Sequence, residues 1–311
     1  MKITIVSSGS RGDIQPYIAL GIGLQKSGHD VTIATHGNFK DFVEENGLKI
    51  LEMVGNPKEI LDSEQGKTML ESGSNPFKSM PMLIDLFKTH LGKFFDGLIE
   101  KLEGTEAIIF TTTTFQSYYI AKKLGIPSIA AYLLPFSNTS DFPNIFVPNP
   151  HKLGFIYNKM THLMMEQLLW QPFRKITNEW LTKELKLEPI PFLGNLGGRN
   201  TDLFPIVYGF SPSVIPKPKD WNDSVHITGY WFLDKAEEYI PEPKLKDFIE
   251  SDKAPIYIGF GSMTNRHPEQ VASMVIEALN KTGQRGILLS GWGGMSNDDL
   301  PDNILMVDSV P

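Results

Sequence analysis

Short apolar runs alternate with apolar positions at helical spacing along the first forty residues. Residues 3–6 form an apolar run that ends in a loop of Gly and Ser, and apolar side chains then recur at helical spacing from Tyr17 to Leu24. Gly28 follows as a helix stop signal, and a second apolar run covers residues 31–34. This order of strand, loop, helix and strand predicts a βαβ unit, and therefore a parallel sheet with a right-handed crossover.

The same pattern returns later in the chain. Strands are predicted at residues 107–111 and 128–133, with a helix at 116–124 between them. After several prolines and a charged run, a strand at 255–261, a helix from Pro268 and a strand at 284–289 start a second unit. We therefore expect an α/β fold with a doubly wound parallel sheet in residues 1–233, a linker at 234–254 and an incomplete second Rossmann-like domain at 255–311.

Two further stretches are predicted to be helical. Residues 56–104 carry one amphipathic stripe, which we interpret as core packing. Residues 151–187 predict a helix interrupted near Pro172, with six basic and three acidic side chains interleaved with Met, Leu and Trp. Such a basic and apolar stretch suits an anionic membrane or an adaptable apolar pocket, and ordinary core packing is the alternative.

Composition narrows the classes of function. The 311 residues include 41% hydrophobic and 21% charged side chains, which is typical of a folded globular protein of about two domains. A net charge of −7 argues against a nucleic-acid-binding protein, and the absence of cysteine excludes disulfides and thiol nucleophiles. Since neither a signal peptide nor a membrane span is recognisable, we expect a cytoplasmic protein.

The loop at residues 7–13 follows the first strand, where open α/β proteins bind ligands. Only Gly9 and Gly12 of a dinucleotide fingerprint are present, and no acidic residue closes the second strand, so an NAD enzyme is disfavoured. Asp13 opens the first helix. Two interpretations of Asp13 stay open, namely a carboxylate that caps the helix and a general base directed into the cleft.

Other common chemistries lack support in the sequence. The seven histidines show no pairing at two, three or four residues apart, so no metal site on one element is indicated. Residues 209–213 lack the final glycine of a nucleophile elbow and carry a proline where its helix must start. A metalloenzyme and a serine hydrolase are therefore both disfavoured.

Motifs along the whole chain resemble one family. Residues 9–20 and 28–36 look like the opening of the sterol glucosyltransferases and their bacterial UDP-glycosyltransferase relatives. Further matches lie at residues 124–127, 210–214, 228–233 and 257–262. The resemblance implies a GT-B fold of two Rossmann-like domains, with the acceptor bound by the amino-terminal half and a UDP-sugar by the carboxy-terminal half.

The resemblance also implies roles for individual residues. Many relatives carry a histidine base in a Gly-His-x-x-Pro loop where this chain has Gly12-Asp13-Ile14-Gln15-Pro16, so the role of base falls to Asp13. The expected donor-binding residues are Ser10, Arg11, Gly12, Gly261, Ser262 and Trp292. The expected acceptor-binding residues are Thr112, Thr114, Phe115, Phe136, Phe142, Phe146, Met164, Leu168 and Leu169. No metal or other cofactor is implied, because a UDP-sugar such as UDP-glucose is a co-substrate.

One departure from the family pattern qualifies this expectation. In the family, the segment resembling residues 307–310 leads into a His-Gly-Gly-x-Gly-Thr box that holds the donor, whereas this sequence ends at Pro311. The leading hypothesis is inverting transfer of a hexose from a UDP-sugar to a sterol or similar lipid. The alternative is an acceptor-binding or partner-dependent fragment without catalysis. For either one we expect residues 152–186 to lie at the mouth of the acceptor cleft and to rest on anionic membranes.

Overall fold

The computed structural model describes residues 1–56, 59, 63, 97–147, 153–194, 203–233, 239–259, 268–289, 300–307 and 310. Its contacts divide the chain into two compact units. The first comprises Met1–Pro57 and Met80–Leu233, and the second comprises Lys58–Ser79 and Asp234–Pro311. The helical stripe predicted within residues 56–104 falls largely outside the described residues.

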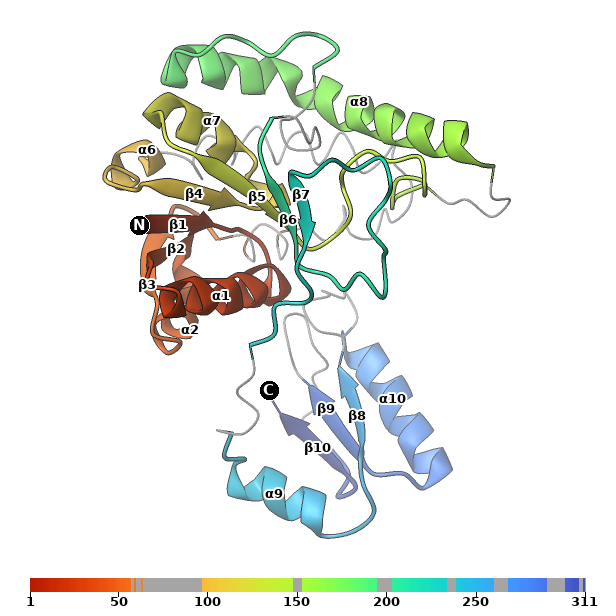
Figure 1. Cartoon of the computed structure of the whole chain (residues 1–311). Coiled ribbons are helices and arrows are strands. Elements are labelled where there is room, and N and C mark those ends of the chain that lie inside the picture. Colours follow the sequence, from red (N-terminus) through yellow and green to blue (C-terminus); the bar gives the residue numbers. More distant parts are fainter. Residues whose placement is uncertain are drawn as a thin grey trace. The chain divides into compact units, whose positions relative to one another are not determined.

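The first unit contains a seven-stranded parallel sheet in the order β3-β2-β1-β4-β5-β6-β7 (Figure 1). The strands are β1 (Lys2–Val6), β2 (Asp30–His36), β3 (Lys49–Met53), β4 (Ala107–Phe110), β5 (Ser128–Tyr132), β6 (Ile206–Tyr208) and β7 (Val225–Ile227). Chain order runs outward in both directions from β1, so the predicted doubly wound parallel sheet is confirmed.

Helices cover both faces of this sheet. Figure 1 shows α1 (Arg11–Lys26) and α2 (Lys40–Glu44) on one face and α6 (Leu98–Lys101) and α7 (Gln116–Leu124) on the other. Alternation along the strands explains this arrangement, because successive side chains point to opposite faces. Gly21 of α1 lies against Val31 and Ile33, while Phe110 packs in the core that includes Ile120 of α7.

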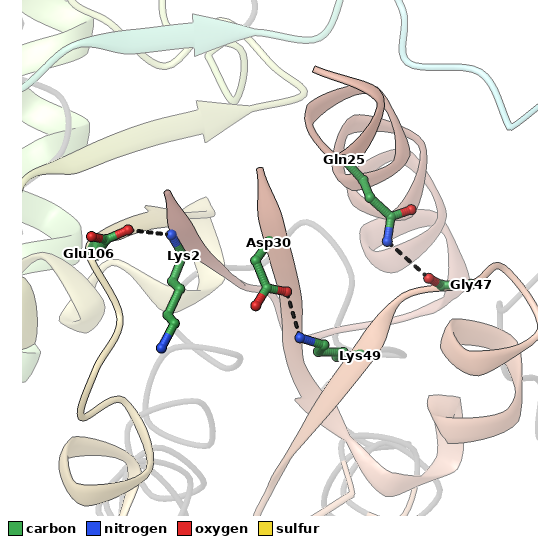
Figure 2. Close-up of polar contacts among 6 residues, drawn as sticks. All are labelled: Lys2, Gln25, Asp30, Gly47, Lys49 and Glu106. Carbon is green, nitrogen blue, oxygen red and sulfur yellow. Dashed lines mark hydrogen bonds and ion pairs between the residues drawn. The ribbon is translucent and has the colours of Figure 1, made fainter. Parts of the chain in front are cut away.

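Polar contacts tie the amino-terminal ends of the strands together. The Lys2 backbone N–H donates to Glu106 at 2.6 Å, Lys49 pairs with Asp30 at 2.6 Å, and Gln25 donates to the Gly47 carbonyl at 3.2 Å (Figure 2). The hydrogen bond from Lys49 is the main cause that lowers the pKa of Asp30. These contacts join neighbouring elements at the edge opposite to the one where parallel α/β sheets bind ligands.

Helix α8 (Phe155–Trp180) is the longest described element of the first unit, and a π-type turn (Leu181–Leu185) continues it. The sequence predicted an interruption near Pro172, and that prediction is wrong, because the helix runs through the proline. Proline removes one backbone donor and crowds the carbonyl four residues earlier, at Leu168, a position on the exposed side of the helix. The buried side chains of Trp170 and Phe173 hold the helix on both sides of this defect.

The second unit contains a three-stranded parallel sheet in the order β10-β9-β8. Its elements are α9 (Pro243–Glu250), β8 (Ile256–Gly259), α10 (Pro268–Thr282), β9 (Gly286–Leu289) and β10 (Ile304–Val307). Helix α9 lies within residues 234–254, where the sequence predicted a linker, and its Leu245 is buried with Ile287 and Leu305. The unit therefore has the strand and helix alternation of a Rossmann-like domain.

Candidate active site

The loops after β1 and β4 are joined at the carboxyl edge of the sheet. The Thr113 hydroxyl donates to the Ser8 carbonyl at 2.6 Å, and the Thr114 hydroxyl donates to the Val6 carbonyl at 2.7 Å. The strand order reverses between β1 and β4. In open parallel sheets such a reversal opens a crevice that is the usual ligand site.

Asp13 stands in the first turn of α1 at this edge. Its Oδ2 accepts hydrogen bonds from the backbone N–H of Ser10 at 2.8 Å and from the Ser10 hydroxyl at 3.0 Å. Gly9 has φ +145°, and a Cβ there would lie 2.3 Å from Oδ2, so only glycine leaves room for the carboxylate. Asp13 therefore has a capping role, although Ser10 is the N-cap and Asp13, the third residue of the helix, closes a capping box with it. None of the described residues donates a hydrogen bond to Oδ1, so this oxygen can accept from a ligand.

Tyr17 lies one turn further along α1 and anchors the helix to β5. Its hydroxyl donates to the Ala131 carbonyl at 2.9 Å, and its ring lies 5.7 Å from that of Trp231. Burial, and then the nearby Asp13 carboxylate, raise the pKa of Tyr17. The phenol therefore stays protonated and keeps donating, which holds the start of α1 at the sheet edge.

His36 is the last residue of β2 and is completely buried beside the same loop. Its Nδ1 lies 2.9 Å from the Gly55 carbonyl and its Nε2 lies 2.7 Å from the Ser8 hydroxyl. A carbonyl only accepts, so Nδ1 carries the proton, and Nε2 of the neutral ring accepts from Ser8. Burial lowers the pKa of His36, against a smaller opposite effect of the backbone of Gly55 and Val54.

From the sequence, His36 falls in the motif at residues 28–36 and no metal site is indicated for it, but the histidine is assigned no part in the candidate site. Its position at the carboxyl end of the second strand was the available signal, because that edge is where α/β proteins gather polar groups.

The segment after β5 carries a series of aromatic rings. The ring centroid of Phe136 lies 6.1 Å from that of Tyr132 and 6.3 Å from that of the exposed Phe146. The ring centroids of Phe142 and Trp221 are 6.4 Å apart. Three of the predicted acceptor-binding residues therefore belong to one aromatic segment.

The carboxylate of Asp220 holds the same segment in place. It accepts hydrogen bonds from the Thr139 hydroxyl at 2.7 Å and from Ser140 at 2.8 Å (N–H) and 2.9 Å (hydroxyl). Burial acts against its charge, but these hydrogen bonds outweigh burial and lower the pKa of Asp220.

The remaining predicted residues take several positions. Thr112 is exposed at the sheet edge, Thr114 is fully buried as a link between loops, and Phe115 packs in the core beside α7. Ser10 donates a hydrogen bond to Asp13, and Gly12 is exposed. The Arg11 Nε donates to Gln15 Oε1 at 3.0 Å, and the Arg11 guanidinium carbon lies 4.9 Å from the centroid of the Phe42 ring.

Three predicted acceptor-binding residues lie on α8, and three donor-binding residues cannot be placed. Met164 and Leu168 are exposed on α8, and Leu169 is half-buried there. Gly261, Ser262 and Trp292 lie outside the described residues.

The described residues offer neither a metal site nor a membrane-spanning helix. No group of three or more His, Asp or Glu side chains gathers there as a possible metal site. Within the same part of the chain, none of the helices has the length and apolar character to cross a membrane.

Comparison with known proteins points to one group of enzymes. Residues 3–140 match the glycosyltransferase family 28 N-terminal domain. The chain is 36% identical over 96% of its length to UDP-sugar-dependent glycosyltransferase 52 of Dictyostelium discoideum, and 33% identical over its full length to a sterol 3-beta-glucosyltransferase of Arabidopsis thaliana. It spans 18% and 49% of the length of these two relatives.

Solved structures agree on the fold. The crystal structure of CalG4, the calicheamicin glycosyltransferase, matches with a TM-score of 0.60 at 15% identity, over 100% of this chain and 71% of that one. At this level of identity the match concerns the fold alone, and the fold is GT-B.

Proposed function

The chain belongs to the family of sterol glucosyltransferases and related UDP-glycosyltransferases, and we propose that it transfers a hexose, in the first place glucose, from a UDP-sugar to the hydroxyl of a sterol or similar lipophilic acceptor. The observation that carries the proposal is the position of the Asp13 carboxylate at the switch point between β1 and β4. A third of the residues match a relative named for this reaction on sterols.

In the proposed mechanism Asp13 acts as general base through Oδ1. The acceptor hydroxyl gives its proton to this oxygen while its own oxygen attacks the anomeric carbon from the side opposite UDP. One C–O bond forms as the bond to the diphosphate breaks, so the configuration at the sugar inverts. The two hydrogen bonds from Ser10 to Oδ2 support this role, because they fix the orientation of the carboxylate.

The aromatic segment after β5 is proposed to contact the acceptor. A sterol is a large rigid apolar body with one hydroxyl, so its site needs apolar walls and few polar groups. Phe136, Phe142 and Phe146 offer such walls, and the exposed Thr112 lies at the same edge of the sheet. Phe115 and Thr114 are committed to packing and to loop contacts, and they would support the acceptor site from behind.

For the donor we propose two groups of residues. Ser10, Arg11 and Gly12 form the start of α1, a 16-residue helix, and a helix start favours a diphosphate. The Ser10 N–H is bonded to Asp13, so the proposed donors to the diphosphate are the backbone N–H groups that follow it. Gly261, Ser262 and Trp292 are proposed from the family resemblance of the second unit. No metal ion or other cofactor enters this scheme, since the sugar nucleotide is consumed as a substrate.

A lipid acceptor also bears on where the protein works. Sterols are dissolved in membranes, so an enzyme that glycosylates them must meet a bilayer. We therefore propose a cytoplasmic protein with peripheral contact to anionic membranes.

The test is steryl glucoside formation from radiolabelled UDP-glucose and a dispersed sterol. The wild-type chain should form product, and Asp13→Asn should lower the rate by roughly 10²–10⁴-fold, as is typical for loss of a general base. Asp41→Asn, an exposed carboxylate in α2, is the matched control and should keep the full rate.

Calorimetric titration with UDP, UDP-glucose and NADH completes the test. We expect affinity for the two uridine compounds and none for NADH. Sterol binding without any affinity for UDP-glucose would favour the acceptor-binding module instead.

A further inference from the structure

The first half of α8 has its polar side chains inside and its apolar side chains outside. Asn158, Thr161, His162 and Glu166 are at most 6% exposed. An apolar stripe, defined here as Ile156, Met160, Leu163, Met164 and Leu168, is between 42% and 65% exposed. The spacing of these five residues places them on one face of the helix. A solvent-facing helix normally has the opposite pattern, so the apolar stripe calls for an apolar neighbour.

The buried polar face fixes this orientation. The Asn158 amide donates to the Ser140 carbonyl at 2.8 Å, Thr161 accepts from the Asn144 N–H at 2.9 Å, and His162 Nε2 lies 3.1 Å from the Phe142 carbonyl. Rolling the helix to bury the apolar stripe would break these contacts and leave buried polar groups unpaired. The stripe is therefore a stable surface of the first unit.

Two loops that are hydrogen-bonded to α8 carry further exposed apolar side chains. Ile145 and Phe146 are exposed and directly follow Asn144, which is bonded to α8. Phe192 and Leu193 are also exposed, and the Phe192 carbonyl accepts from Trp170 at 3.0 Å and from Gln171 at 2.7 Å. From Ile156 to Leu168 the helix rises about 18 Å, which suits a helix lying flat in a membrane interface.

The charges on this helix identify the occupant. Helix α8 holds three basic residues, Lys159, Arg174 and Lys175, and two acidic ones, Glu166, which is buried, and Glu179, which is exposed in the last turn. The solvent side of this stretch is therefore cationic and apolar in a chain of net charge −7. Anionic lipid headgroups above acyl chains match both properties, whereas a second copy of the chain would bring like charges together.

We infer that the apolar stripe of α8, with Ile145, Phe192 and Leu193, inserts into the interface of an anionic bilayer. The inference rests on the proposed function in one respect only: a lipid acceptor explains why the protein would bind a bilayer. Its test uses neither donor nor acceptor, so failure here leaves the transfer reaction standing.

The test is co-sedimentation of the 311-residue chain with vesicles of phosphatidylcholine containing about 30% phosphatidylserine, and with pure phosphatidylcholine vesicles. We expect binding that is stronger on the anionic vesicles and weaker at high salt. Ile156→Ser with Leu163→Ser should lower the affinity at least about tenfold, because two apolar side chains no longer insert. The matched control is Val214→Ser with Met274→Ser, two apolar residues exposed to a similar degree elsewhere, which should bind normally.

Two charge-reversal variants distinguish the effect of the basic residues on α8 from the effect of the net charge of the whole chain. Lys159→Glu with Lys175→Glu should abolish the preference for anionic vesicles. Lys122→Glu with Lys123→Glu, the same change in charge on exposed positions of α7, should retain it.

Three outcomes would overturn the inference. The first is a chain that binds neither kind of vesicle, and the second is a serine double variant that binds as well as the wild type. The third is a dimer in light scattering that the serine variant dissociates, which would assign the stripe to a second copy. Unchanged circular dichroism of the variants shows that they are folded.

Discussion

At the scale of single residues, the candidate site combines two kinds of polar group. Asp13 has one oxygen engaged in holding the start of α1, and no described residue bonds the other. His36 has both ring nitrogens engaged, by Gly55 and Ser8. The histidine is therefore a positioning residue for the Ser8 loop, while Asp13 is the group that we propose to meet the substrate.

His36 makes stability depend on pH. In the unfolded chain a histidine has a pKa of about 6.5, and in the folded protein burial lowers the pKa of His36. Below about pH 6.5 the unfolded state therefore binds more protons, and the free energy of unfolding falls with a slope of at most about 1.4 kcal/mol per pH unit from this group. Urea unfolding at about pH 7.5 and about pH 5.5 measures the effect.

His36→Gln should reduce this loss of stability, because the titrating group is gone. His226→Gln, at an exposed position, should leave it as in the wild type. An equal acid loss in the His36 variant and the wild type would contradict the assignment.

At the scale of elements, α1 sits closely against the sheet through a glycine. A Cβ on Gly21 would lie 2.9 Å from Leu48 and 3.4 Å from both Ile33 and Val31, whereas a Cβ on Gly23 would meet nothing within 4 Å. The close approach brings the first turn of α1, with Asp13, to the edge where β1 and β4 end. Packing of α1 thus sets the position of the proposed base.

Two alanine variants of α1 test this contact. Both gain helix propensity, so Gly23→Ala should stabilise the protein by roughly 0.5–1 kcal/mol. Gly21→Ala gains the same propensity but crowds Leu48, so it should be at least about 1 kcal/mol less stable than Gly23→Ala. Chemical unfolding compares the two, and equal stabilities would show that α1 does not pack closely at Gly21.

At the scale of the whole molecule, each unit has a core of its own. Ile108 is fully buried in the first unit among side chains such as Phe110 and Ile120, and Leu288 is fully buried in the second with Leu279 and Ile304. Among the described residues, none belongs to both of these clusters. The two units are therefore expected to open separately.

Hydrogen exchange read by mass spectrometry tests this separation. Leu288→Ala should cost about 2–5 kcal/mol and speed exchange in β8, β9 and β10 alone. Ile108→Ala should do the same for the strands of the first sheet and spare the second. Faster exchange throughout the chain in either variant would mean one cooperative unit.

Part of the first unit could be read from the sequence, because apolar periodicity and Gly or Pro signals are local: β1, β2, β4, β5 and the helices α1 and α7 were predicted. The strands β3, β6 and β7 were not predicted, and β6 and β7, with three residues each, are too short to show a period. The runs at residues 3–6 and 31–34 and the helical spacing from Tyr17 were enough to predict a parallel βαβ sheet, and the motif around Asp13 was enough to indicate the family. The break predicted at Pro172 was wrong for the same reason, because a local rule takes no account of the burial of Trp170 and Phe173 beside the proline.

Other features depended on tertiary structure, because they join residues far apart in the chain. The contact between Ser8 and His36 spans 28 positions, and that between Thr114 and Val6 spans 108. The face that α8 turns toward the protein was likewise decided by tertiary contacts. Polar residues on one face form hydrogen bonds with the segment at 140–144, so the apolar face lies outside. Periodicity alone predicts burial of the apolar face, and only the competing cost of unpaired polar groups reverses it.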